Sequence, residues 1–178
     1  MRRLARGARG ALRGWAWTLL LACGGCSAEN DETALRTPST KDFAPVSAVF
    51  ERRCGGLDCH GSPARNLRIY GFSGLRANGL DVTGGSPTTE AEIAATFEAL
   101  VSVDPESLSR VAAERGASPE RWLVISKGRA REHHEGGARL TKGTPGDDCI
   151  VSWLAEKVAV ETCAEDAFGP SPLPGEAW

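Results

Sequence analysis

Arg53-Cys54-Gly55-Gly56-Leu57-Asp58-Cys59-His60-Gly61 is the stretch of this 178-residue chain that is richest in chemically reactive side chains. Four residues separate the two cysteines, and a histidine follows the second one directly. The whole chain contains only three histidines and six cysteines, so this grouping uses a large share of them. We therefore expect the rest of the chain to form a small shell around this point.

Two thiols followed by an imidazole have a specific chemical use. In the C-x-x-C-H motif, the cysteines form thioethers with a haem and the adjacent histidine binds the iron. The present spacing is C-x-x-x-x-C-H, a longer variant of that motif. It predicts that Cys54 and Cys59 attach haem c covalently and that His60 is the proximal iron ligand.

A distal iron ligand must come from elsewhere in the chain. Methionine, a common distal ligand in c-type haem proteins, occurs only as Met1, which the predicted signal peptide removes. The remaining candidates are His133 and His134, which precede Gly136-Gly137. Glycines allow the backbone to come close to a flat ring. The residues alone leave the choice between the two histidines open.

The N-terminus has the features of an export signal. Five arginines and no acidic residue lie in Met1–Gly14, and the apolar segment Trp15–Ala22 is too short to span a bilayer. Leu20-Leu21-Ala22-Cys23 resembles the lipobox of bacterial lipoproteins. We therefore predict a lipid on Cys23, with Cys26 as the alternative site, and a location in the cell envelope, at the outer membrane facing the periplasm. The alternative is an ordinary signal peptide that is cleaved without lipidation.

Processing makes the chain acidic. The full chain has 21 basic and 23 acidic side chains, and removal of the five N-terminal arginines leaves 16 basic ones, a formal charge near −7. An acidic protein has no electrostatic attraction to nucleic acid. The expected partners are the membrane, through the lipid, and a redox protein.

The remaining cysteines suggest a disulfide. Six cysteines suit an exported protein in an oxidising compartment. We predict a Cys149–Cys163 bond, which closes a loop of about 15 residues and contributes about 3 kcal/mol in the chain-entropy model. The bond requires the chain to turn back near Glu161. Cys26 has no assigned partner if Cys23 carries the lipid.

The predicted organisation is a signal peptide (1–22), a flexible polar tether (23–42), a domain (43–163) and a disordered Pro/Gly-rich tail (164–178). Helix signals such as proline at the first position and a capping box predict about five short helices joined by long loops. They cover roughly 45–53, 90–101, 104–116, 118–125 and 144–158. The predicted fold class is mainly α, a small domain similar to cytochrome c.

The motifs resemble a known group of proteins. Cytochrome-like domains in exported proteins of planctomycetes and myxobacteria pair Cys…Cys-His-Gly with a later His-x-Gly-Gly, followed by an acidic residue and Trp-Leu. The matching positions here are Cys54 to Gly61, His134 to Gly137, and Asp148 to Leu154. The resemblance implies that His134 is the distal ligand. It also implies a lipid-anchored, monohaem, non-enzymatic protein that transfers electrons or senses redox state or a gas.

Two other interpretations of the same residues exist. Cys54 and Cys59 can form a small disulfide around Gly55-Gly56, and the chain is then a disulfide-stabilised, non-enzymatic envelope lipoprotein without haem. Zinc can instead be bound by Cys54, Cys59, His60 and His134, which are suitable ligand types.

Other residues carry weaker signals. Arg65, Arg68 and Arg76 are candidates to pair with haem propionates, although exposed arginines commonly form solvated salt bridges. Trp122 and Trp153 suit either a haem wall or an ordinary core. The sequence contains no phosphate-binding glycine loop, no Ser/His/Asp arrangement and no carboxylate pair typical of hydrolases.

Overall fold

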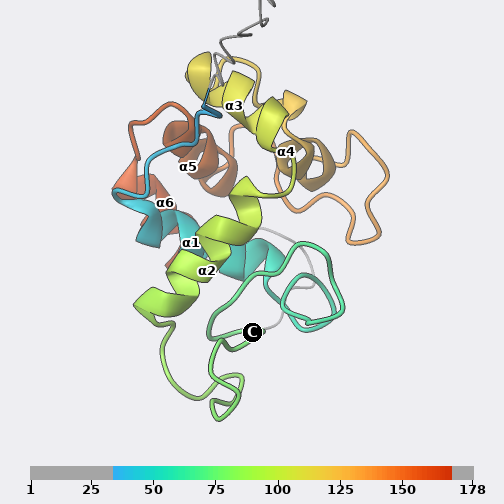
Figure 1. The fold of residues 1–178 in the computed structure, drawn as a ribbon, viewed down its shortest axis with the longest axis vertical. Coiled ribbons are helices and arrows are strands. Elements are labelled where there is room, and N and C mark those ends of the chain that lie inside the picture. Colours follow the sequence, from blue (N-terminus) through green and yellow to red (C-terminus); the bar gives the residue numbers. More distant parts are fainter. Residues whose placement is uncertain (1–33, 170–178) are drawn as a thin grey trace, which may run out of the picture. The chain divides into compact units, whose positions relative to one another are not determined.

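The computed structural model describes residues 34–169, which belong to one compact unit of the chain. They form six α-helices, one 3₁₀-helix and no β-strand, so the predicted mainly α fold is confirmed (Figure 1). The elements are α1 (Phe43–Cys54), α2 (Glu90–Val101), α3 (Pro105–Ala113), η1 (Pro119–Arg121), α4 (Leu123–Gly128), α5 (Pro145–Leu154) and α6 (Val160–Phe168).

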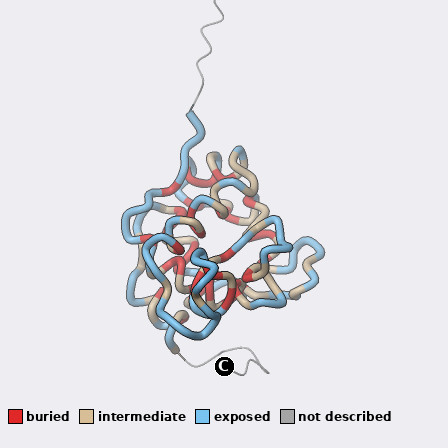
Figure 2. Tube along the Cα trace, turned by 60° about the horizontal axis from the view of Figure 1, so that its bottom comes forward, coloured by how far each residue is buried: buried red, intermediate tan, exposed pale blue. Residues whose placement is uncertain are grey.

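Helix α1 lies at the centre of the packing and contacts α2, α5 and α6. Its predicted apolar residues Val46, Val49 and Phe50 are completely buried. Phe43 packs on Trp153, with ring centroids 5.1 Å apart, and on Phe97 at 5.2 Å. Trp122 also packs on Trp153, with ring centroids 6.1 Å apart, so both tryptophans belong to the buried core. The buried segments run through the interior in Figure 2.

Local sequence signals predicted most of the helix starts correctly. The capping box at the start of α2 is formed, since Thr89 accepts a bond from the Glu92 backbone and the Glu92 side chain bonds back to Thr89. Proline occupies a first-turn position in α3, η1 and α5. The predicted helix over 118–125 is instead two short pieces, because the backbone of Trp122 is extended between η1 and α4.

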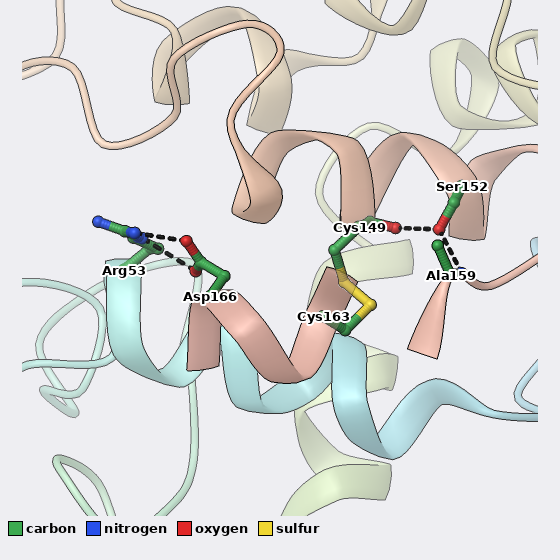
Figure 3. The surroundings of a disulfide bond; sticks show 6 residues. All are labelled: Arg53, Cys149, Ser152, Ala159, Cys163 and Asp166. Carbon is green, nitrogen blue, oxygen red and sulfur yellow. Dashed lines mark hydrogen bonds and ion pairs between the residues drawn. A yellow bond between two sulfur atoms is a disulfide. The ribbon is translucent and has the colours of Figure 1, made fainter. Parts of the chain in front are cut away.

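The end of the domain differs from the prediction. Residues 164–168, assigned to a disordered tail, continue helix α6, and the segment around Val158 lies in the turn before it rather than in α5. Asp166 explains the added length, because its carboxylate binds the guanidinium of Arg53 in α1 (Figure 3). Both side chains are almost fully buried, so α6 ends in a specific contact. Residues 170–178 lie outside the described part.

The start of the described chain is attached to the domain. Arg36 forms an ion pair with Glu156 at 2.8 Å, and the carbonyl of Ser39 accepts a bond from the indole of Trp153. The part of the predicted tether that begins at Ala34 therefore follows the domain surface. Across residues 34–169, no helix has the length and apolar character needed to cross a membrane. The predicted lipid sites Cys23 and Cys26 lie outside the described residues.

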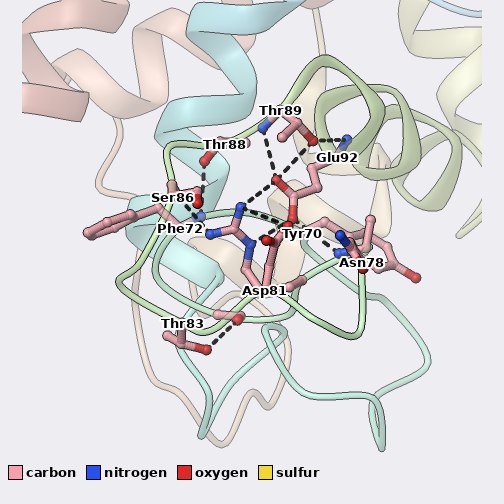
Figure 4. A network of polar contacts seen from close by, with 12 residues as sticks. Tyr70, Phe72, Asn78, Asp81, Thr83, Ser86, Thr88, Thr89 and Glu92 are labelled. Atoms are coloured by element: carbon pink, nitrogen blue, oxygen red, sulfur yellow. Dashed lines mark hydrogen bonds and ion pairs between the residues drawn. The ribbon is translucent and has the colours of Figure 1, made fainter.

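A long irregular segment between α1 and α2 is tied to both helices by buried polar groups. The carboxylate of Glu51 accepts bonds from Ser73 and Thr88. Arg76 pairs at 2.7 Å with Glu92, which Figure 4 shows at the centre of a polar network. Thr96 of α2 accepts a bond from the backbone of Tyr70. This segment has no helical period, and specific polar contacts rather than regular structure hold it in place.

The predicted Cys149–Cys163 disulfide is present, and both cysteines are completely buried. Helix α5 ends at Leu154, and the chain reverses through 155–159, where Glu156 has a φ of 58°. The turn is earlier than the expected position near Glu161. It allows α6 to run back along α5, so that the two cysteines face each other (Figure 3).

Replacing both cysteines, Cys149→Ser with Cys163→Ser, is expected to lower the free energy of unfolding by about 3 kcal/mol, because the unfolded chain regains the freedom of a closed loop. Urea denaturation followed by circular dichroism measures the change. Reduction of the wild-type protein should give a similar loss. A change below about 0.5 kcal/mol would contradict a stabilising role for the bond.

Candidate haem-binding site

Helix α1 ends at Cys54, the first residue of the Cys…Cys-His motif. Beyond it the backbone folds tightly. The backbone N–H of His60 donates to the carbonyl of Cys54 at 2.9 Å, and the backbone N–H groups of Cys59 and Gly61 both donate to the carbonyl of Gly56. These bonds bring the histidine back beside the end of the helix. The extra residues between the cysteines are therefore accommodated in a compact, hydrogen-bonded loop.

Glycines make this close backbone packing possible. A Cβ atom at Gly61 would lie 1.8 Å from the carbonyl oxygen of Gly55, and one at Gly74 would lie 1.9 Å from the same oxygen. Neither distance is compatible with a side chain. Gly61 is thus required because two backbone segments touch there.

The orientation of His60 is set by its backbone neighbour. Its Nδ1 lies 3.1 Å from the carbonyl oxygen of Leu67. A carbonyl can only accept a hydrogen bond, so Nδ1 carries the proton and donates it. Burial lowers the pKa of His60, an effect that the bond to Leu67 opposes and His134 reinforces, which favours the neutral ring. Nε2 is then left with a lone pair, the arrangement that metal-binding histidines commonly use.

His134 shows the same arrangement. Its Nδ1 lies 2.9 Å from the carbonyl oxygen of Gly137, so in the neutral ring this nitrogen donates and Nε2 keeps its lone pair. The backbone of Gly137 returns a bond to the His134 carbonyl and adopts a φ of 66°. Gly136 lies against the imidazole. The Gly-Gly pair therefore shapes the turn that holds the His134 ring.

The two imidazoles lie close together and nearly parallel. Their centroids are 6.0 Å apart and their planes differ by 9°. Two metal–nitrogen bonds of about 2.0–2.1 Å, together with the distances from nitrogen to ring centre, place two axial imidazoles about 6–6.5 Å apart. The observed separation of the ring centres falls within this range, with the two ring planes stacked nearly parallel.

His133 lies differently from its neighbour. Its side chain is exposed, whereas that of His134 is partly buried. The backbone carbonyl of His133 accepts a bond from Lys127 at 3.0 Å, which fixes the loop and leaves the His133 ring near solvent. The structure therefore pairs His134, and not His133, with His60.

Two cavities adjoin the histidine pair. The first, of about 580 Å³, is mainly apolar and is walled by residues of α1, α2 and α4. Cys54 lines it. The second, of about 480 Å³, is polar and contains Cys59. Four residues line both cavities: His60, His134, Arg65 and Lys127. The histidines thus mark the junction of two spaces, each of which carries one cysteine.

Both thiols are free cysteines that resist ionisation. Burial, reinforced by nearby Cys59, raises the pKa of Cys54 to about 12. Burial and then Asp58 raise the pKa of Cys59 as well. The possible Cys54–Cys59 disulfide is not formed.

Within residues 34–169, no group of three or more His, Cys, Asp or Glu side chains is placed to hold a metal ion. The four-residue zinc site is thus not assembled. A haem has a lower requirement, since its porphyrin already surrounds the iron and protein side chains supply only the axial ligands. Two imidazoles whose Nε2 atoms keep a lone pair, together with an adjoining apolar cavity, are compatible with this group.

The three arginines that the sequence suggested for propionate binding lie in different surroundings. Arg76 is buried in its ion pair with Glu92, and Arg68 is exposed and bonds to the carbonyl of Arg65. Arg65 alone among the three lines the cavities, and Lys127, which the sequence did not indicate, joins it. Lys127 lies in α4, far from the Cys…Cys-His motif in sequence, so no local pattern pointed to it.

Comparisons of the chain with protein-family models, with curated proteins and with solved structures found no match.

Proposed function

We propose that this chain is a lipid-anchored, monohaem c-type cytochrome that transfers single electrons in the cell envelope. The observation that carries the proposal is the pair of His60 and His134, parallel and 6.0 Å apart, each with Nδ1 bonded to a backbone carbonyl. The packing of the fold does not by itself require two parallel histidines beside two free cysteines.

The roles of the residues follow from their positions. Cys54 and Cys59 would hold the haem through thioethers, His60 would be its proximal ligand and His134 its distal ligand. The bound group would supply one-electron chemistry through its iron. The carbonyls of Leu67 and Gly137 keep both imidazoles in the Nδ1–H tautomer, which increases their strength as ligands. If His60 and His134 both bound the iron, the group would supply electron transfer rather than binding of O₂.

The proposal is tested by producing the full chain in a host that attaches haem in its periplasm. An absorption spectrum that changes reversibly with dithionite, and colour that survives acid-acetone extraction, are expected. Cys54→Ser with Cys59→Ser should make all colour extractable. Colourless wild-type protein would instead favour the haem-free, disulfide-stabilised lipoprotein.

Membrane attachment is a separate part of the proposal. Labelled palmitate is expected on the wild-type chain and not on Cys23→Ser, because the lipobox-like sequence ends at Cys23. Label that persists in Cys23→Ser and disappears in Cys26→Ser would move the lipid to Cys26.

A further inference from the structure

We infer that the last turn of helix α4 positions His134 and so decides whether this histidine reaches the iron. The inference rests on the proposed function and adds the residues that place its second ligand. Ser126 and Lys127 act through the loop that carries His134, which makes them positioning residues.

His134 lies in a long irregular loop that extends from the end of α4 (Figure 1). The loop comprises residues 129–144, between the last residue of α4 and the first residue of α5. Closing such a loop and holding one of its side chains in place costs conformational entropy. The bond from His134 to Gly137 shapes only the turn around the ring. Contacts with the rest of the domain must therefore fix where that turn lies.

The chain just before His134 is bonded to two adjacent residues of α4. The hydroxyl of Ser126 donates to the carboxylate of Glu132 at 3.0 Å. The ammonium of Lys127 donates to the carbonyl of His133, also at 3.0 Å. Ser126 is buried, so its hydroxyl is a fixed point of the fold. The bond from Lys127 reaches the peptide group that joins His133 to His134, and it restrains the backbone next to the imidazole.

The chain after His134 is bonded to the next residue of the same helix. The carbonyl of Gly128 accepts bonds from the backbone N–H groups of Arg139 and Leu140, at 2.8 and 2.9 Å. Leu140 is buried, and its side chain lies against Gly128, where a Cβ atom would be 2.8 Å from it. One turn of α4 therefore holds the loop on both sides of His134.

Two other contacts act elsewhere in the loop. The buried pair of Arg129 with Asp147, at 2.8 Å, joins the two ends of the loop. Glu135 lies 3.7 Å from Arg65, which is longer than a hydrogen bond, and its side chain is 80% exposed. Neither contact is made to the peptide group before the imidazole, and this leaves the placement of the ring to α4.

The supports of His60 are separate from α4. Its backbone N–H donates to the carbonyl of Cys54, and its Nδ1 donates to the carbonyl of Leu67, so both partners belong to its own segment. Loss of the bonds from α4 should therefore displace His134 and leave His60 in place. The consequence is specific to the second axial position of the iron.

The first experiment uses the full chain produced without haem attachment. Hydrogen exchange is measured by NMR at the backbone N–H groups of Gly137 and Leu140, whose bonds report on the turn and on the attachment to α4. Ser126→Ala with Lys127→Met should accelerate this exchange about tenfold or more, because two bonds that hold the loop are lost. Lys127→Met alone keeps the buried hydroxyl and should change the exchange in the same direction, which guards against misfolding of the double variant.

The matched control is Thr141→Ala with Lys142→Met. It removes a hydroxyl and an ammonium group from adjacent, exposed positions of the same loop. Exchange at Gly137 and Leu140 should remain at the wild-type rate. Lys127→Arg, which keeps a cationic donor for the carbonyl of His133, should also exchange like the wild type.

The second experiment uses the covalently loaded chain. Ser126→Ala with Lys127→Met is expected to bind carbon monoxide about tenfold or more faster than the wild type, because His134 leaves the iron more often. The control pair and Lys127→Arg should keep the wild-type rate. Wild-type rates of exchange and of carbon monoxide binding in the double variant would overturn this inference, while haem attachment itself stands. Failure of the wild-type chain to retain any haem would overturn both the inference and the proposed function.

Discussion

The His134→Ala variant of the haem-loaded protein is expected to have a high-spin spectrum and to bind carbon monoxide. Removal of the imidazole would take away the second ligand that we propose for the iron, since His134 is the ring that lies parallel to His60 at 6.0 Å. Covalent attachment through Cys54 and Cys59 should persist, so the colour remains after acid-acetone extraction. Absorption spectra with and without carbon monoxide measure the change.

His133→Ala is the matched control, since it removes the same side chain one residue earlier. Its ring is exposed and the loop is held by the backbone carbonyl, which the substitution retains. The variant should therefore keep the low-spin wild-type spectrum. The opposite pattern would make His133 the ligand, and two unchanged spectra would remove both residues from that role.

Glu92→Ala is expected to lower the free energy of unfolding by about 3 kcal/mol, because it removes the closest carboxylate from the buried guanidinium of Arg76 and leaves it with Asp81 at 4.0 Å and two backbone carbonyls. Glu92 is 1% exposed and accepts bonds from Arg76, Thr89 and Ala77 (Figure 4). Glu90→Ala, at an exposed position of the same helix turn, should change stability by less than about 0.5 kcal/mol. Urea denaturation of the three proteins measures both effects.

The contribution of Glu92 should also depend on pH. Burial alone would raise the pKa of this carboxyl, but the bonds from Arg76, Thr89 and Ala77 lower it to about 2, against an ordinary value of 4.5. A lowered pKa in the folded state means that the stabilisation is complete above pH 4.5 and is lost as the pH falls towards 2. The difference between wild type and Glu92→Ala should shrink over this range. A difference that is constant with pH would contradict the ion pair as its source.

Much of the fold was predictable because its signals are local. Thr89 with Glu92, and prolines such as Pro105 and Pro145, mark helix starts whatever the tertiary structure. Helix α6 was not predicted, because it is short and next to a Pro/Gly-rich tail. Its bond to Cys149 was predicted, but its other support, the buried pair of Asp166 with Arg53, joins residues that are 113 positions apart in the sequence.

The candidate site divides in the same way. Cys54, Cys59 and His60 could be identified from the local sequence motif, and the resemblance to cytochrome-like domains favoured His134. Sequence did not predict the carbonyls that orient the rings, or Lys127 at the junction of the cavities. The contact of His60 with Leu67 lies in the loop after α1, where backbone touches backbone at Gly61, and no local sequence pattern marks such a contact.

The most direct test of the central claim is a mass spectrum of one tryptic peptide. Cleavage after Arg53 and Arg65 releases residues 54–65, which contain both cysteines and His60. For protein matured in a haem-attaching periplasm, we predict that this peptide carries the mass of one haem, bonded to both Cys54 and Cys59. Recovery of the peptide without haem, either as free thiols or as an internal disulfide, would contradict the assignment of this chain as a c-type cytochrome.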